Sequence, residues 1–151
     1  MSAKHFSFVS YRDLRELVDT AAERYPNTEF FISSDKLLPY ITGRQLRHCC
    51  CAFAHVVRSE GRQDEHIAVL GHNCAAWITA FFSIVTGGCV AAPLSVDAKE
   101  DELDYCVKKA DCTALVYEIG SRHEAERLKA SNPGLRLVEM HELVSALLAC
   151  E

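Results

Sequence analysis

The chain has 151 residues, of which 49% are hydrophobic and 25% charged, and its net charge is -5. This composition supplies a hydrophobic core for a single domain, 1–151, and excludes a disordered tail. No apolar run approaches the ~20 residues that span a bilayer, and basic residues form no stripe, so we expect neither a membrane span nor a nucleic-acid surface. The amino terminus lacks the apolar core of a secretory signal, which favours a cytoplasmic location.

Eight cysteines are many for this length, yet no two of them form a C-x-x-C pair. In a reducing cytosol we expect free thiols that fill the core as small hydrophobes, with one thiol exposed. Cys49, Cys50 and Cys51 are consecutive, so on a helix their side chains point in three directions and cannot bind one metal ion. A structural zinc site is therefore the less favoured interpretation.

Hydrophobic periodicity predicts alternating helices and strands along the chain. Ser10 and Asp13 start a helix that Pro26 ends. Residues 29–33 and 37–41 then predict a β-hairpin, or two short strands around a turn.

A second helix and a buried strand follow this region. Thr42 and Gln45 form a capping box, in which each side chain satisfies a free backbone N–H. The helix that they start ends at Gly61. Residues 66–71 are nearly all apolar, as expected of a strand that is buried on both faces.

The next helix and strand have equally clear ends. Asn73 is predicted to cap the helix, which ends at Gly87 and Gly88, where a left-handed residue is needed. Residues 89–94 predict a second buried strand, and Pro93 near its end withholds a backbone N–H.

The remainder of the chain continues the alternation. A helix over residues 101–109 has acidic residues in its first turns and lysines in its last, which suits the helix dipole. Strand 113–117, helix 121–130, strand 135–138 and a helix from about His141 follow. The pattern predicts the α/β class: an open, mostly parallel sheet with helices on both faces, plus a short N-terminal β-hairpin.

The histidines offer little chemistry by themselves. His48, Cys51 and His55 could share one helix face and bind a metal ion, but neighbouring arginines would repel a cation, so a solvated face is favoured. His66 opens a strand and is interpreted as structural. No partner is visible in the sequence for His5, His123 and His141.

Gly71, His72 and Asn73 stand at the carboxyl end of a buried strand and before a helix, where open α/β sheets bind ligands. A simple N-cap role for Asn73 is the favoured alternative. The chain has no phosphate-loop, dinucleotide-binding or nucleophile-elbow motif. From the residues alone, it offers a scaffold without a complete active site.

A longer pattern runs through residues 66–94. Its positions are Ile67, Ala68, Asn73, Trp77, Gly88, Val90, Pro93 and Leu94. In this order and spacing they resemble the early part of the adenylate-forming (AMP-binding) superfamily, which includes acyl-CoA synthetases, luciferases and nonribosomal-peptide adenylation domains. Segments 14–26, 40–46, 102–105 and 112–116 match further parts of the pattern. Within the superfamily the chain is most similar to bacterial long-chain fatty-acid–CoA ligases.

The resemblance implies an enzyme that activates a fatty acid with ATP as an acyl-adenylate and then transfers it to CoA, with Mg²⁺ and a lysine stabilising phosphate charge. In the family, the phosphate loop, the ribose-binding Asp and the catalytic Lys come later in the chain, and none of these strings occurs here. ATP, Mg²⁺ and CoA would thus serve the full-length enzyme. This chain would be an inactive N-terminal fragment without catalytic, cofactor-binding or metal-binding residues, in which Gly71, His72 and Asn73 form a wall of the substrate site.

Two hypotheses of different class follow. In the first, the partner of this fragment is the remainder of the same polypeptide, and apolar area left exposed leads to self-association. In the second, the chain is a stand-alone, non-catalytic binding or oligomerisation module whose surface is finished for solvent. A thiol redox domain is the least favoured alternative, because the C-x-x-C motif is missing.

Overall fold

A computed structural model of the chain describes residues 10–150, so His5 and the start of the chain considered as a signal lie outside the described residues. The helices are α1 (Leu14–Arg24), α2 (Gly43–Ser59), α3 (Ala75–Thr86), α4 (Glu100–Lys109), α5 (Arg122–Ser131), α6 (Met140–Ala149) and the short 3-10 helix η1 (Ile119–Ser121). The strands are β1 (Glu29–Phe30), β2 (Ile41–Thr42), β3 (His66–Leu70), β4 (Val90–Leu94), β5 (Ala114–Tyr117) and β6 (Arg136–Glu139). Within the described part, none of the helices has the length and hydropathy needed to cross a bilayer.

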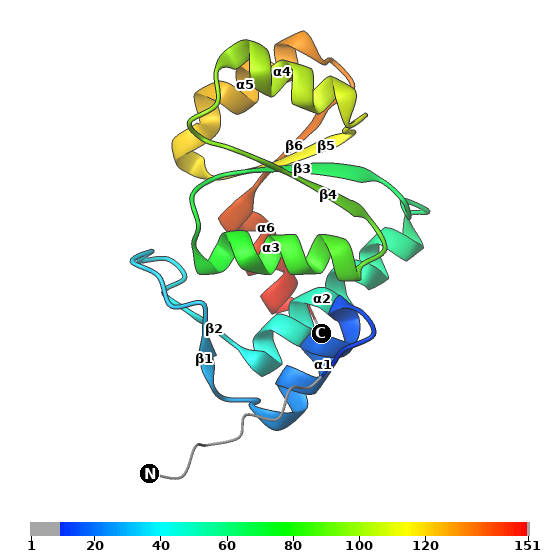
Figure 1. Cartoon of the computed structure of the whole chain (residues 1–151), viewed down its shortest axis with the longest axis vertical. Helices are drawn as coiled ribbons and strands as arrows, with labels where there is room; N and C mark the ends of the chain where they lie inside the picture. The colour runs from blue at the N-terminus through cyan, green and yellow to red at the C-terminus, as the bar shows by residue number, and fades with distance from the viewer. Residues whose placement is uncertain (1–9, 151) are drawn as a thin grey trace.

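The central sheet has four parallel strands in the order β4–β3–β5–β6. Helices α4 and α5 cover one face, and α3 and α6 cover the other, with α1 and α2 packed outside them (Figure 1). The predicted α/β class, with a parallel sheet and helices on both faces, is confirmed.

The pleat of β3 explains why one strand serves two cores. Ile67 and Val69 point into the core beneath α2, α3 and α6, whereas Ala68 and Leu70 point into the core beneath α4 and α5. All four side chains are at most 4% exposed. The prediction of a strand buried on both faces is therefore confirmed for β3.

The same prediction is wrong for β4. This strand lies at the edge of the sheet, with a neighbour on one side only. Val90 is 47% exposed, and Ala91 and Ala92 are only partly buried. The run of apolar residues predicted burial, but the position of a strand in the sheet order determines how much of it is covered. Apolar surface therefore remains open along this edge.

The antiparallel strand pair near the amino terminus is confirmed, but it is shorter than the ranges 29–33 and 37–41. Only two residues of each strand pair, with Glu29 opposite Thr42 and Phe30 opposite Ile41. The ten residues between the strands form an irregular loop that lies beside α3 and α6 (Figure 1). A ladder this short holds its two ends together but leaves the loop conformation to other contacts.

Polar caps start the first helices. The Asp13 side chain accepts the Glu16 backbone N–H, and Thr42 and Gln45 form the predicted capping box at the start of α2. The prediction that Asn73 caps α3 is wrong. The cap is Cys74, whose Sγ accepts the Trp77 backbone N–H at 3.4 Å. Asn73 is thereby left outside the helix.

All eight cysteines are free thiols, and most of them are buried or half-buried. Burial raises the pKa of Cys49 to about 12 and that of Cys112 to about 11, so both thiols stay protonated at neutral pH. Cys51 and Cys150 are exposed, whereas one exposed thiol was expected. The other cysteines act as the predicted core-filling residues.

The turn between α3 and β4 depends on a left-handed glycine. Gly88 has a φ of +92°, and open space surrounds the position of a Cβ. We expect Gly88→Ala to lower the free energy of unfolding by about 1–2 kcal/mol, because an L side chain disfavours this backbone conformation. Urea unfolding followed by circular dichroism measures the change.

Gly120 is the matched control, because a Cβ there also meets open space, but its φ is not positive. Gly120→Ala should leave stability unchanged or raise it by about 0.5 kcal/mol. Equal losses in the two variants would show that the conformation of Gly88 is not the cause.

Candidate functional site

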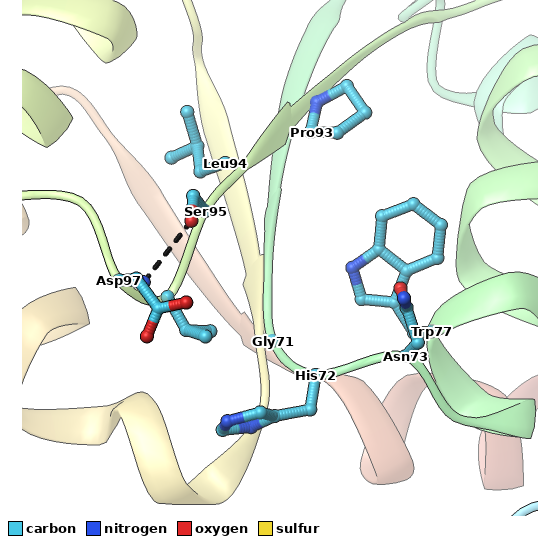
Figure 2. Close-up of a pocket in the computed structure, with 9 residues that line it drawn as sticks. Gly71, His72, Asn73, Trp77, Pro93, Leu94, Ser95 and Asp97 are labelled. Carbon is cyan, nitrogen blue, oxygen red and sulfur yellow. Dashed lines mark hydrogen bonds between the residues drawn. The ribbon is translucent and has the colours of Figure 1, made fainter.

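A cavity of about 500 Å³ opens at the carboxyl ends of β3 and β4. The residues that line it are Gly71, His72, Asn73, Trp77, Pro93, Leu94, Ser95, Val96 and Asp97. Figure 2 shows Ser95 and Asp97 on one side and Trp77 on the other, with His72 at the lower edge of the view. Because β3 and β4 are parallel and Leu70 pairs with Leu94, the loops that follow both strands meet at one edge of the sheet.

The connection after β3 leads to a helix on one face of the sheet, and the connection after β5 leads to a helix on the other face. Parallel sheets form their ligand-binding crevice between two strands of this kind. Here Glu118, which follows β5, reaches His72, which follows β3 and lines the cavity. Its Oε2 accepts the backbone N–H of His72 at 2.9 Å and lies 2.8 Å from Nδ1 of the ring.

Gly71 allows this close approach. A Cβ on residue 71 would lie 2.9 Å from the Cβ of Glu118 and 3.2 Å from the terminal methyl group of Met140. Only a residue without a side chain lets the β3–α3 loop pass so near Glu118. The contact between His72 and Glu118 thus depends on the backbone conformation that Gly71 allows.

Glu118 is held in its charged form. Burial would raise its pKa, but the hydrogen bonds donated by the backbone and ring of His72, and the charges of His72 and His141, together hold the pKa below its usual range. The carboxylate also fixes the ring of His72, since Nδ1 must carry the proton that points to it. Nε2 of this 71%-exposed side chain then stays free at the edge of the cavity.

The opposite wall of the cavity is aromatic. The ring of Trp77 stacks on Phe81 with centroids 5.5 Å apart and planes 7° from parallel. Its Nε1 is buried and has no hydrogen-bond partner among the described residues. An indole N–H in this situation is a donor available to an oxygen atom of a ligand.

The polar groups of the cavity carry little positive charge. Asp97 contributes a carboxylate, Ser95 a hydroxyl that accepts the backbone N–H of Asp97 at 3.2 Å, and Asn73 an amide. None of the nine lining residues is Lys or Arg. The walls of this chain can therefore hold a neutral or amphipathic group, but they provide no fixed cation to balance a phosphate.

Gly71, His72 and Asn73, which the sequence singled out, all line the cavity. Ser95, Asp97 and Glu118 were missed, although each follows a predicted strand. The carboxyl ends of parallel strands meet at one edge, and this rule could have identified them. From the sequence, Trp77 is a position of the family pattern with no predicted role in the site.

His48, Cys51 and His55 lie together with Cys150 around a second cavity of about 360 Å³ beside α2. Among residues 10–150, no three histidine, cysteine or acidic side chains are placed to hold a metal ion. His66 instead contacts the backbone oxygen of Ala110 through Nδ1 at 2.5 Å. The structural interpretation of His66 is thus supported.

Comparison with known proteins points to one family. The family model described as AMP-binding enzyme matches residues 18–148. A relative is YngI of Bacillus subtilis (strain 168), whose name describes an acyl-CoA synthetase; it is 23% identical over 100 residues. The match covers 66% of this chain but 18% of YngI.

Solved structures share the fold. The N-terminal domain of FACL13 from Mycobacterium tuberculosis has a TM-score of 0.77 at 14% identity, over 93% of this chain and 36% of that one. VinN has a TM-score of 0.75 at 21% identity, over 89% and 36% of the two chains. The anthranilate CoA ligase AuaEII, in complex with anthranoyl-AMP, has a TM-score of 0.75 at 18% identity, over 90% and 27%. The chain therefore spans about a third or less of the length of these relatives.

The bond between Glu118 and His72 gives stability a defined pH dependence. The lowered pKa of Glu118 stabilises the fold fully above its ordinary value of 4.5, and this contribution is lost as the pH falls through the lowered value. We expect Glu118→Gln to cost about 1 kcal/mol at pH 7, and the difference from the unsubstituted chain should shrink below pH 4.5. Urea unfolding between pH 3 and pH 7 measures both effects.

Glu126→Gln, an exposed substitution on α5, serves as the control and should change stability little at any pH. A loss in Glu118→Gln that stays constant from pH 3 to pH 7 would contradict the role given to the charge.

Proposed function

Because this chain belongs to the AMP-binding enzyme family, we propose that it is the amino-terminal part of an ATP-dependent acid–thiol ligase. Such a ligase joins a carboxylate to AMP with release of pyrophosphate, and the thiol of CoA then displaces AMP. The observation that carries the proposal is the match of the family over residues 18–148 in a chain that spans only a fraction of its relatives. Both described cores belong to the matched range.

The composition of the cavity supports a ligase in which this chain contacts the acid and other parts bind the nucleotide. In our proposal, Gly71, His72 and Asn73 form a wall of the acid-binding site, and Trp77 supplies an apolar face. In this proposal phosphate and Mg²⁺ bind to residues outside this chain, and the lack of Lys and Arg among the nine lining residues supports this for the phosphate. ATP, Mg²⁺ and CoA are thus ligands of the whole enzyme.

We propose a long-chain fatty acid as the carboxylic acid, and the cytoplasm as the location. The name of YngI as an acyl-CoA synthetase supports an acyl substrate. The name of AuaEII as an anthranilate CoA ligase identifies an aryl acid as the alternative to test.

A stand-alone binding or oligomerisation module, formed by the one domain 1–151, is the second candidate function. The exposed edge of β4 counts against this candidate, because a stand-alone domain normally covers an apolar edge strand or places charged side chains on it. Val90 is 47% exposed on this strand, and Ile32 and Leu37 are exposed by 73% and 75% on the loop after β1. These surfaces favour a part that packs against the remainder of a polypeptide.

ATP–pyrophosphate exchange tests the proposed function. We expect the 151-residue chain to give no exchange above a buffer control with palmitate, octanoate or anthranilate, because the phosphate-binding strings of the family are missing. A longer protein that joins this chain to the remainder of such a ligase should give exchange, and the acid with the highest kcat/KM identifies the substrate class. Exchange by the 151-residue chain alone, or none by the longer protein with any of the three acids, contradicts the proposal.

Self-association through the β4 edge is a second expected outcome. Light scattering at increasing concentration should show oligomers of the unsubstituted chain. The Val90→Lys variant should have a lower average mass, closer to that of a monomer, because a lysine blocks pairing of edge strands. Ile119→Lys is the matched control, since Ile119 is exposed to a similar extent, 51% against 47% for Val90, but lies away from this edge. A monomer at all concentrations, or an equal effect of both substitutions, would count against this surface.

A further inference from the structure

The loop between β1 and β2, residues 31–40, forms a strap beside α3 and α6. Two short bonds shape it: the Ser33 N–H donates to the Pro39 oxygen at 2.8 Å, and the Leu37 N–H donates to Oδ1 of Asp35 at 2.9 Å. Of its apolar side chains, Leu38 packs against the main core, and the ring of Phe31 stacks on Phe82 of α3 with centroids 6.1 Å apart. The strap thus has internal hydrogen bonds and apolar contacts near each of its ends.

Cavities lie on both sides of the strap. One of about 170 Å³ separates residues 31–33 from Asn73 and Cys74 at the start of α3, and one of about 220 Å³ separates Leu37 and Leu38 from α6. Phe31, at one end of the strap, has a φ of +53°, in the left-handed region that L side chains rarely adopt. A polar contact also joins the strap to α6.

That contact is an ion pair across 106 residues of sequence. Nε2 of His141, in the first turn of α6, lies 2.6 Å from Oδ2 of Asp35, and its Nδ1 lies 3.4 Å from Oε1 of Glu139. The side chains of His141 and Asp35 are each 15% exposed. A neutral imidazole carries one N–H, so it can donate a hydrogen bond to only one of these carboxylates. The lone pair on its other nitrogen would then point at an oxygen of the second carboxylate, which is repulsive. Both contacts are favourable only when the ring is protonated.

The surrounding groups strengthen this preference. Burial would lower the pKa of His141, but the hydrogen bonds and charges of Asp35 and Glu139 outweigh it and raise the pKa above the ordinary value of 6.5. The charge of His141 also helps to lower the pKa of Glu118, whose own hydrogen bonds go to His72. Glu139 also accepts the backbone N–H of Glu142. His141 therefore contacts two carboxylates, those of Asp35 and Glu139.

We propose that the strap is a pH-dependent cover, held against α6 by protonated His141 and released when His141 loses its proton. The contact contributes fully below pH 6.5, the ordinary value for histidine, and is lost as the pH rises through the raised pKa of His141. At the acid end it is lost as the pH falls through the lowered pKa values of Asp35 and Glu139. Because residues 31–33 share a cavity with Asn73, release uncovers one end of the candidate site.

Hydrogen exchange read by mass spectrometry tests the cover. After correction for the intrinsic effect of pH, amides of residues 31–40 should exchange about tenfold faster at pH 9 than at pH 6, the size of effect expected when one hydrogen bond to a charged group is lost. In His141→Gln the strap should exchange fast at both pH values. Amides of β3 and β5 report whether each variant is folded.

Three further variants distinguish the contact of Asp35 with His141 from the effects of other histidines. Asp35→Asn should remove most of the pH dependence, and it also tests the proposal if His141→Gln fails to fold. His72→Gln and the exposed His123→Gln should keep the pH dependence. The proposal is overturned if the strap of the unsubstituted chain exchanges equally at both pH values, if Asp35→Asn keeps the dependence, or if His72→Gln abolishes it.

Discussion

The parallel pairing of β3 with β4 on one side and β5 on the other is the constraint on which the candidate site depends. Leu70 lies opposite Leu94 and opposite Tyr117, so three strands end at one level. The next residue along each strand is therefore brought to the same edge: Gly71, Ser95 and Glu118. Three segments distant in sequence become one site without a dedicated loop, because parallel strands carry their carboxyl ends together.

The two ends of the sheet use carboxylates in opposite ways. At the amino ends of the strands, Glu65 pairs with Arg62 at 3.5 Å and with Arg136 at 2.5 Å. Arginine keeps its charge at every pH that the fold meets, so the cations of these pairs are permanent. At the carboxyl ends the partners of the carboxylates are the imidazoles of His72 and His141, and the carboxylates beside His141 raise its pKa. Permanent cations at one end of the sheet thus contrast with imidazole partners at the other.

The sequence predicted most of what depends on local contacts, with the cap of α3 as an exception, and missed what depends on sheet order or on distant pairs. The capping box at Thr42 needs four consecutive residues, and residues 71–73 follow directly from a strand and a helix start, so both could be identified. The exposure of Val90 could not be predicted, because an apolar strand has the same sequence pattern at the centre and at the edge of a sheet. The contact of Asp35 with His141 joins residues that no periodicity relates, and only the folded chain shows it.

Trp77 is the single tryptophan of the chain, and it lies in the wall of the cavity with its ring stacked on Phe81. Every photon that the chain emits from indole therefore originates at this one place. The half-buried ring, with its N–H unpartnered among the described residues, is sensitive to the polarity of whatever fills the cavity. The emission spectrum of the chain is consequently a local optical reading of the candidate site rather than an average over the molecule.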